Sequence, residues 1–362
     1  MPFRLAVRTD DAALRDLLRR SAMPGGIRVA YTREPDYFAG ASVMATQAQT
    51  LVYETEGRIK AMACRKIIPM YINGEARDFG YLGGFRIDPA ARNGIITGRG
   101  YRALRGLHAD GRAPAYLSTI VSSNRFARGY LTSKRAGLPT YKDIGEYQVY
   151  TVLCKKRKPR PRGVDIVRGN RIPLHEIVSF LAENGSQRQF YPVYDVSDFS
   201  GPRTGGFRRD DFFVAVRNSR ILGVVGAWDQ SAYRQYRIDG YEGWIGLLRP
   251  LLNRLLRMRG FALLPEPGSS LRGCIVSFLG VRNQDTGVLR DLLDALHTHA
   301  VTGGYTAFSI GFHECDALRE SVRSFPAVRY TSRMYLVYWE DGAQFAHTCS
   351  NGRVPHLEPA TL

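Results

Sequence analysis

The stretch from Tyr81 to Leu107, YLGGFRIDPAARNGIITGRGYRALRGL, is the part of the sequence that most constrains the fold of this chain. An apolar strand pattern ends at Ile87, an Asp-Pro pair at 88–89 stops it, and a basic loop rich in glycine leads into a helix. Glycine lets backbone N–H groups come close to an anion, and the N-terminus of a helix adds a positive dipole. The sequence therefore predicts an anion site between strand and helix, of a kind that fits a pyrophosphate.

Residues of the loop and of the first helical turns are the candidates for this site. Gly94, Gly98 and Gly100 would allow the close backbone approach, and Arg92 and Arg99 would add positive charge. Basic turns with a few glycines are nevertheless common on protein surfaces, so the loop by itself does not identify a phosphate site. The segments that follow it make the interpretation more specific.

The patterns after the helix complete an order that resembles the GNAT acyltransferase superfamily. An alternating strand, AYLSTIVSS, precedes an N-R-F-A sequence at 124–127, a short helix that carries Tyr130, and another strand, EYQVYTVL. In the family, a strand, an R/Q-x-x-G-x-G/A loop and a helix are followed by a strand, an N-x-x-A helix with a tyrosine, and a closing strand. The resemblance covers Phe3 to about Leu153.

The loop departs from the family pattern in its length. Family loops place two residues between the Arg or Gln and the first glycine, whereas five residues separate Arg92 from the triplet Gly98-Arg99-Gly100. The loop either bulges so that the triplet holds the phosphates, or the helix starts nearer Thr97 and the triplet lies in its first turn. In a third alternative the loop no longer binds a cofactor.

The resemblance implies an acyl-CoA, with acetyl-CoA as the expected cofactor and no metal. A backbone N–H near Phe85 would polarise the thioester carbonyl, Tyr130 would donate a proton to the departing thiolate, and Asp78 is the first candidate for the base. Glu54, Glu56 and His313 are alternative bases, although strand-end carboxylates are most often only solvated. The expected cofactor-binding residues are Phe85, Arg86, Ile87, Arg92, Asn93, Gly94, Thr97, Gly98, Arg99, Gly100, Tyr101 and Asn124.

The second half of the chain repeats the order of the first at an offset of about 190 residues, without the glycine-rich loop. We therefore expect an α/β (α+β) fold of two GNAT-like domains in tandem, each a mixed, mostly antiparallel sheet flanked by helices. The expected boundaries are 1–154 for the acyl-CoA-binding domain, 155–163 for a basic linker that contains prolines, 164–341 for a degenerate domain, and 342–362 for an irregular tail. A short helix is also expected within 34–42, and Asn73-Gly74 predicts a hairpin.

Composition limits the partners and the compartment. The formal charge of +18 favours anionic partners such as CoA phosphates or, less strongly, nucleic acid. The five cysteines are scattered and none forms a C-x-x-C pair, which argues against a disulfide framework or a zinc site. No apolar run is long enough to span a membrane, so we expect a cytoplasmic protein with no membrane partner.

These features predict an acyl-CoA-dependent N-acetyltransferase acting on a small-molecule or peptide amine. The amine is expected between the domains, against a wall that includes Trp228, Tyr233 and Glu314. An aminoacyl-tRNA-dependent peptidyl transferase of the tandem GNAT-like type is one alternative, since the charge suits tRNA. A non-catalytic acyl-CoA sensor is another. The sequence does not choose the acceptor, because one fold hosts many functions.

Overall fold

The computed structural model describes residues 3–21, 27–91, 94–133, 135, 137–157 and 163–362. Apart from the segment between α1 and β3, its first half follows the strand and helix order expected from the sequence. Asn73-Gly74 forms the expected hairpin between two long strands, with Asn73 in the left-handed conformation that asparagine tolerates well. The elements are β1 (Phe3–Leu5), α1 (Asp11–Arg20), β3 (Gln47–Thr55), β4 (Arg58–Ile72), β5 (Glu75–Ile87), α2 (Gly94–His108), β6 (Tyr116–Val121), α3 (Arg125–Leu131) and β7 (Thr140–Leu153).

The second half repeats this order. Its elements are β8 (Asp165–Arg168), α4 (Leu174–Gly185), β10 (Phe212–Arg217), β11 (Arg220–Trp228), β13 (Gly273–Val281), α6 (Thr286–Thr302), β14 (Ala307–His313) and β15 (Ala327–Tyr338). The position equivalent to α3 holds a 3-10 helix, Ala317–Val322. Further elements are β2 (Ile27–Thr32), β9 (Tyr191–Pro192), β12 (Gln235–Tyr241), α5 (Trp244–Met258) and α7 (Ala343–Thr348).

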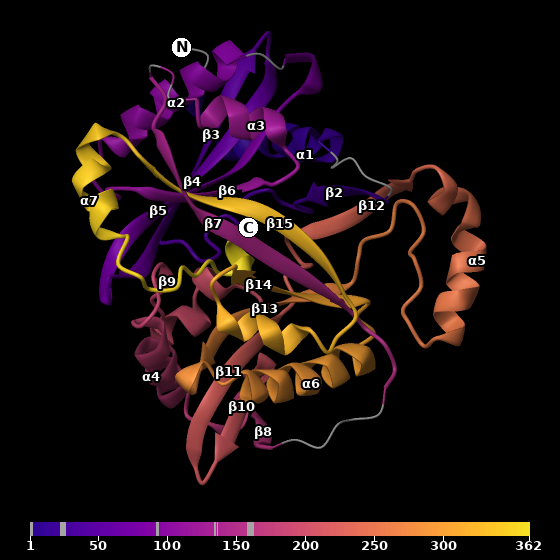
Figure 1. Ribbon diagram of the computed structural model, residues 1–362. Helices are drawn as coiled ribbons and strands as arrows, with labels where there is room; N and C mark the ends of the chain where they lie inside the picture. The colour runs from indigo at the N-terminus through magenta and orange to yellow at the C-terminus, as the bar shows by residue number, and fades with distance from the viewer. Residues whose placement is uncertain (1–2, 22–26, 92–93, 134, 136, 158–162) are drawn as a thin grey trace.

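One mixed, mostly antiparallel sheet joins the two halves, in the order β1-β3-β4-β5-β6-β15-β7-β14-β13-β11-β10-β8. The closing strands are exchanged between the halves. Strand β15, the last strand of the second half, lies between β6 and β7 of the first half, and β7 pairs in turn with β14. Figure 1 shows β15 and β7 crossing the middle of the molecule side by side. The halves are therefore one continuous structure.

Helices cover both faces of the sheet because adjacent strand residues point to opposite faces. In the second half, Val224 packs into the cluster that includes α4, and the next residue, Val225, packs into the cluster that includes α6. In the first half, Leu82 packs with α2 and α3, whereas α1 packs on Val52 of β3. The fold class is thus α+β with flanking helices, as the sequence predicts.

Two expectations about local structure were wrong. Residues 37–44 form turns and no helix in the segment that connects β2 of the small sheet to β3 of the main sheet. The tail after Asp341 is not irregular throughout, since it contains α7 and ends in a buried segment at 356–361. Glycine and proline predict a break in regular structure, but they do not predict exposure: Leu357 and Ala360 are each only 1% exposed.

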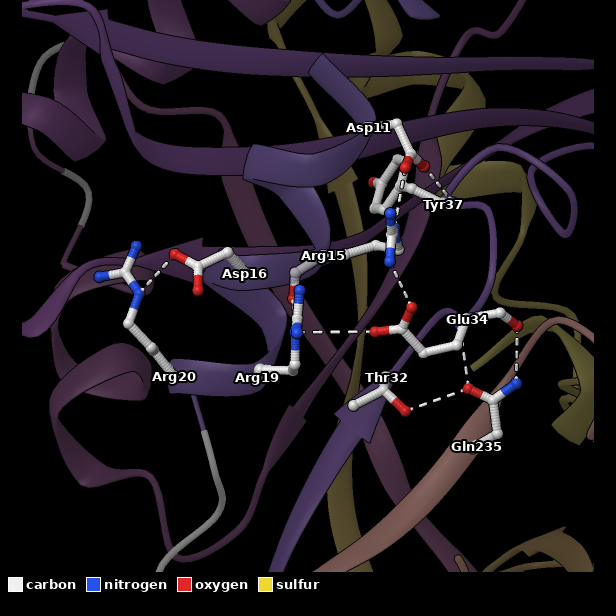
Figure 2. A network of polar contacts seen from close by, with 9 residues as sticks. All are labelled: Asp11, Arg15, Asp16, Arg19, Arg20, Thr32, Glu34, Tyr37 and Gln235. Carbon is white, nitrogen blue, oxygen red and sulfur yellow. Dashed lines mark hydrogen bonds and ion pairs between the residues drawn. The ribbon is translucent and has the colours of Figure 1, made fainter. Parts of the chain in front are cut away.

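A second, two-stranded sheet ties the halves together on one side. Strand β12 of the second half pairs antiparallel with β2 of the first half. Figure 2 shows the polar network at the end of this pair. The Gln235 side chain accepts from Thr32 Oγ1 at 3.0 Å and donates to the Glu34 backbone oxygen at 2.8 Å, and the Glu34 carboxylate pairs with Arg15 of α1. The N-terminal end of β12 is therefore held by hydrogen bonds to the first half.

Candidate functional site

Strands β5 and β6 part within the sheet. They run parallel and pair only at Gly80–Tyr116, Tyr81–Leu117 and Leu82–Ser118. Beyond that point β5 stays paired with β4 up to Ile87, and β6 stays paired with β15 up to Val121. The two strands therefore separate at their carboxyl ends, where parallel strands of open sheets receive ligands.

A bulge at Gly84 adjoins this split. The register between β4 and β5 shifts between Met62 and Cys64, and Gly84 has a φ of +64°. A Cβ atom on Gly84 would lie 3.0 Å from Cys64 Sγ, so the position requires glycine both for its conformation and for its space. A bulge leaves a backbone group without its ladder partner. The next residue, Phe85, is 40% exposed, and Arg86 Nη1 donates to its carbonyl oxygen at 2.9 Å.

The strand ends at a buried carboxylate. Asp88 accepts hydrogen bonds from Arg20 Nη1 at 2.6 Å and from the Ala90 backbone N–H at 3.0 Å. The Arg20 guanidinium and, after it, the Ala90 N–H hold the pKa of Asp88 below its usual value. Asp88 therefore fixes the turn that leads from β5 toward α2.

Helix α2 begins at Gly94, three residues before the start that the second sequence alternative placed near Thr97. The N–H groups of the first turn of a helix point out of its N-terminus, and the N-terminus of α2 follows the end of β5 in the chain. Gly98 and Gly100 lie inside the helix, where an added Cβ atom would meet only ordinary van der Waals contacts. A Cβ atom would lie 3.8 Å from Tyr130 Oη at Gly98 and 3.4 Å from the Phe3 ring at Gly100. Arg92 and Asn93 lie outside the described residues.

Positive charge gathers on α2. Arg99, Arg102 and Arg105 are exposed, and none of them has an ion pair in the part of the chain that the structure describes. Arg125 at the start of α3 is also exposed. Since the N-terminal end of the α2 dipole is also positive, this end of the helix favours anions. Thr97, also expected here, is buried.

Asn124 and Tyr130 lie at opposite ends of α3. The Asn124 side chain caps the helix, because its Oδ1 accepts from the Ala127 N–H at 3.0 Å. The N-x-x-A spacing thus has a structural cause in this chain. Tyr130 directs its hydroxyl toward α2 at Gly98, and the Arg135 guanidinium lies 4.8 Å from the centre of its ring.

Tyr101 links α2 to strand β7. Its hydroxyl is hydrogen-bonded to that of Tyr141, and burial followed by the neighbouring Tyr141 raises the pKa of Tyr101 well above its usual value. Burial also raises the pKa of Tyr141 to about 12. Both phenols therefore stay neutral near pH 7. Tyr141 lines an open pocket of about 580 Å³ with Arg125, Arg128, Gly129, Thr132, Asp143 and Tyr335.

The expected base Asp78 does not lie at the split. It is seven positions before Phe85 on β5, which places it roughly 23 Å away along an extended strand. Its carboxylate pairs with Arg112 Nη2 at 3.0 Å on the surface. Sequence reasoning placed Asp78 by its closeness to the central strand, but it precedes the wrong end of that strand. Asp78 is therefore too far from the split to act as the base.

Lys66 is a buried cation that sequence reasoning missed. It pairs with Tyr81 in the β4–β5 ladder, and its Nζ donates to the Val43 backbone oxygen at 3.0 Å. Burial, and then the neighbouring Arg33 and Arg234, lower the pKa of Lys66 to about 7. The signal in the sequence was a basic pair, RK, within the apolar run of β4.

A small cavity adjoins Lys66 between the halves. Its volume is about 10 Å³, which is close to the space that one water molecule needs. Its lining comes from both halves and comprises Tyr31, Arg33, Gly40, Val43, Lys66, Tyr233, Arg234, Ala360 and Thr361.

The second half has the same architecture, but side chains of the protein itself occupy the positions that correspond to the split of the first half. Strands β13 and β14 pair in parallel over Gly273–Ile275, and the β13 bulge places Phe278, with a φ of +56°, where the first half has Gly84. The Phe278 N–H donates to Glu358 Oε2 at 3.1 Å. At the start of α6, the Asp285 carboxylate accepts from the Gly287 and Val288 N–H groups at 2.8 and 3.2 Å. In the second half, the N–H at the bulge and the N-terminus of the helix are thus both bound by carboxylates of the protein.

The expected wall residues serve the interior of the structure. Trp228 is fully buried and donates to the Gly205 oxygen at 3.1 Å, and the Tyr233 hydroxyl donates to the same oxygen at 3.0 Å. Glu314 accepts from the Glu146 N–H at 2.9 Å. The expectation that Trp228 faces a cleft was wrong, because its full burial on β11 belongs to the main core.

Neither a membrane-spanning helix nor a metal site is found within the described residues. Within them, no helix has the length and hydropathy that a membrane span requires. The same residues contain no group of three His, Cys, Asp or Glu side chains that could hold a metal ion.

Comparison with known proteins adds a likeness of fold. No known family model matches the sequence, and no curated protein matches it. Saccharomyces cerevisiae N-myristoyltransferase with bound myristoyl-CoA superposes with a TM-score of 0.58 at 9% identity, over 93% of this chain and 79% of that one. A second structure of that enzyme gives 0.56 at 10% identity, over 93% and 82%. A GCN5-related glucosamine N-acetyltransferase region of a fungal multi-domain GH3 β-N-acetylglucosaminidase gives 0.62 at 12% identity, over 92% and 38%.

Proposed function

Because this chain has the fold of the GNAT superfamily in two tandem domains, we propose that it is an acyl-CoA-dependent N-acyltransferase. The observation that carries the proposal is the separation of β5 and β6 after Leu82 and Ser118, beside the Gly84 bulge and ahead of α2. A pantetheine arm would lie between the separated strands, and its pyrophosphate would lie at the N-terminus of α2, where the helix dipole favours an anion.

The donor would bind in the first half. Its phosphates would lie at the N-terminus of α2, which begins at Gly94, and beside the guanidinium of Arg99, which has no ion pair within the described residues. Arg92 and Asn93, just before the helix, are proposed to contribute as the sequence predicts. The second half would bind no donor, since Glu358 and Asp285 occupy the equivalent positions.

The chemistry would be direct attack of an amine on the thioester. A backbone N–H at the bulge, near Phe85, would donate to the carbonyl oxygen and stabilise the negative charge that develops there. Tyr130 would transfer its proton to the departing thiolate. The new bond joins the amine nitrogen to the acyl carbon, and the bond that breaks joins that carbon to sulfur.

We propose acetyl-CoA as the donor and a small-molecule or peptide amine as the acceptor. The structural neighbour with a TM-score of 0.62 is described as a glucosamine N-acetyltransferase region, which supports an acetyl donor. The neighbours described with bound myristoyl-CoA make a long-chain donor the alternative.

The test is release of free CoA thiol from acetyl-CoA and myristoyl-CoA in the presence of amines, amino acids and peptides. We expect turnover with at least one donor and acceptor pair. Tyr130→Phe should lower kcat by about a hundredfold or more, as general acids do, with little change in donor affinity. Tyr71→Phe, on β4 and away from the split, is the matched control and should be unchanged.

Two outcomes would contradict this proposal and favour a different function. Donor binding without turnover on any acceptor would favour an acyl-CoA sensor. Turnover with aminoacyl-tRNA but not with acyl-CoA would favour a peptidyl transferase, which the charge of +18 also suits.

A further inference from the structure

Helix α5, which follows β12, has no buried residue along its 15 residues. It stands at the edge of the molecule, away from the central sheet (Figure 1). Isolated helices of this length are marginally stable in water, and most helices in proteins are stabilised by packing of an apolar face. A helix with an apolar face and no core of its own therefore needs a further surface to pack on.

One face of α5 is held by the loop that follows it. Arg249 Nη1 donates to the Pro265 oxygen at 2.9 Å. The Asn253 side chain donates to the Leu264 oxygen at 3.1 Å and accepts from the Leu264 N–H at 2.7 Å. Because β12 is itself anchored through Gln235 (Figure 2), α5 has a fixed base. Its opposite face is left open.

The open face is apolar and continuous. Its residues recur at i, i+3, i+4, i+7, i+11 and i+14, which places them on one side of a helix with 3.6 residues per turn. Their exposed fractions lie between 44% and 83%. They are Trp244, Leu247, Leu248, Leu251, Leu255 and Met258.

Positive charge flanks this face. Between Gly243 and Phe261 the sequence has four arginines and no acidic residue. Arg254 and Arg257 are exposed, and neither has an ion pair in the described ranges of the chain. At the C-terminal end of α5, the Lys156 N–H donates to the Gly260 oxygen at 3.0 Å, which brings an exposed lysine to the same end.

We propose that α5 docks on a membrane surface that contains anionic lipids. An interfacial helix has leucine and tryptophan on one face and arginine or lysine on the other, with no need to span the bilayer. The apolar face of α5 lies at the boundary of the headgroups and acyl chains, and Arg254, Arg257 and Lys156 face the lipid phosphates. The helix has arginines and no acidic residue, which matches a uniformly anionic lipid surface. A protein partner would have a mixed surface and would not require this one-sided charge.

This docking goes beyond the proposed acyltransferase activity and does not depend on it. It also differs from the sequence-based expectation of no membrane partner, which was derived from the lack of a spanning segment. A helix that lies in the interface needs no such segment.

The test is co-sedimentation of the full chain with phosphatidylcholine vesicles that do or do not contain phosphatidylserine. We expect binding to the anionic vesicles, weakened by salt. L247Q/L251Q should lower that binding at least about tenfold, because each leucine contributes its transfer free energy. Glutamine has nearly the helix propensity of leucine, and neither position is buried, so the fold should be kept.

Two variants with the same change in net charge distinguish the contribution of α5 to vesicle binding from the contribution of the overall charge. R254E/R257E should abolish binding, whereas R171E/R220E, at exposed arginines outside α5, should retain most of it. The proposal is overturned if the wild type does not sediment with anionic vesicles, or if L247Q/L251Q binds like the wild type. It is also overturned if the wild type is a dimer in solution that L247Q/L251Q dissociates, because the face then contacts a second copy of this chain.

Discussion

Gly84 shows how one residue shapes the candidate site. Its left-handed conformation moves the backbone of β5 out of register with β4, and its missing side chain leaves room for Cys64. Any other residue there would meet both a conformational and a steric cost. The proposed site for the thioester carbonyl would therefore be coupled to the stability of the strand.

We predict that Gly84→Ala lowers the free energy of unfolding by about 2–4 kcal/mol and weakens acyl-CoA binding about tenfold. Gly57→Ala is the matched control, since Gly57 has a similar φ of +66° but no atom within 4 Å of an added Cβ. It should cost only about 1 kcal/mol and leave binding intact. Urea denaturation and calorimetry measure the two effects. Equal effects of both substitutions would show that the bulge has no special role.

Lys66 makes the stability of the protein depend on pH in a defined direction. Its pKa of about 7 in the folded chain lies below the value of 10.5 that it has when unfolded. Between these values the unfolded chain binds one more proton, so stability rises with pH across this window and is lost as the pH falls toward 7. The slope from this residue is up to about 1.4 kcal/mol per pH unit.

Lys66→Met should remove this slope. We expect urea denaturation at pH 7, 8 and 9 to show wild-type stability rising relative to that of the variant, with the largest difference at pH 7 in favour of the variant. Both proteins keep the same tyrosines and cysteines, so the difference isolates Lys66. If the stabilities of the wild type and the variant changed with pH in parallel, Lys66 would be charged in the folded protein, and the lowered pKa would be wrong.

Strand β15 makes the folding of the first half depend on the second half. It is hydrogen-bonded to β6 through Ser332–Val337 and to β7 through Ala327–Tyr338. Without it, two central strands of the first half would have no shared partner, and buried residues such as Met334 would leave a gap in the core. The first half is therefore not an independent folding unit.

Expression of residues 1–157 alone should give a chain that does not unfold cooperatively and does not bind acyl-CoA. Co-expression with residues 163–362 should restore both properties, because β14 and β15 pair with β7 across the cut. Thermal denaturation and co-purification would show this. A stable fragment 1–157 that binds acyl-CoA would contradict the role given to β15.

The comparison of sequence and structure shows which elements local patterns can predict. Asn73-Gly74 and the order from Tyr81 to Val121 predicted the strands and helix of this region correctly, because each pattern depends on residues close in sequence. The place of β15 depends on pairing across more than 200 residues, which no local pattern specifies. The start of α2 at Gly94 was also missed, since glycine is a poor helix former and the pattern favoured a later start.

Side chains at the site were harder to predict than strands. Asn124 was correctly placed at the start of a helix, but its capping role appears only with the geometry. Asp78 lies at the opposite end of β5 from the split, because a carboxylate near a strand in sequence can be at either of its ends. Lys66 and Glu358 were missed because burial depends on contacts between the two halves.

For the whole molecule, the two halves repeat one architecture but differ in what fills the split. In the first half the bulge is a glycine, and the arginines of α2 lack ion pairs within the described residues. In the second half, the N–H at the bulge residue Phe278 is bound to Glu358, and the N-terminus of α6 is capped by Asp285. The second half thus uses carboxylates of its own chain, one of them from the tail, at the positions where we propose that the first half binds a ligand.

Calorimetric titration of acetyl-CoA into the intact chain tests this central claim most directly, because the number of sites distinguishes the alternatives. Our account predicts one equivalent of ligand bound per chain, with affinity falling as salt is raised, since the phosphates meet α2 and its arginines. Two equivalents would mean that the second half also binds. No binding of acetyl-CoA or of myristoyl-CoA would contradict the assignment of the split as an acyl-CoA site.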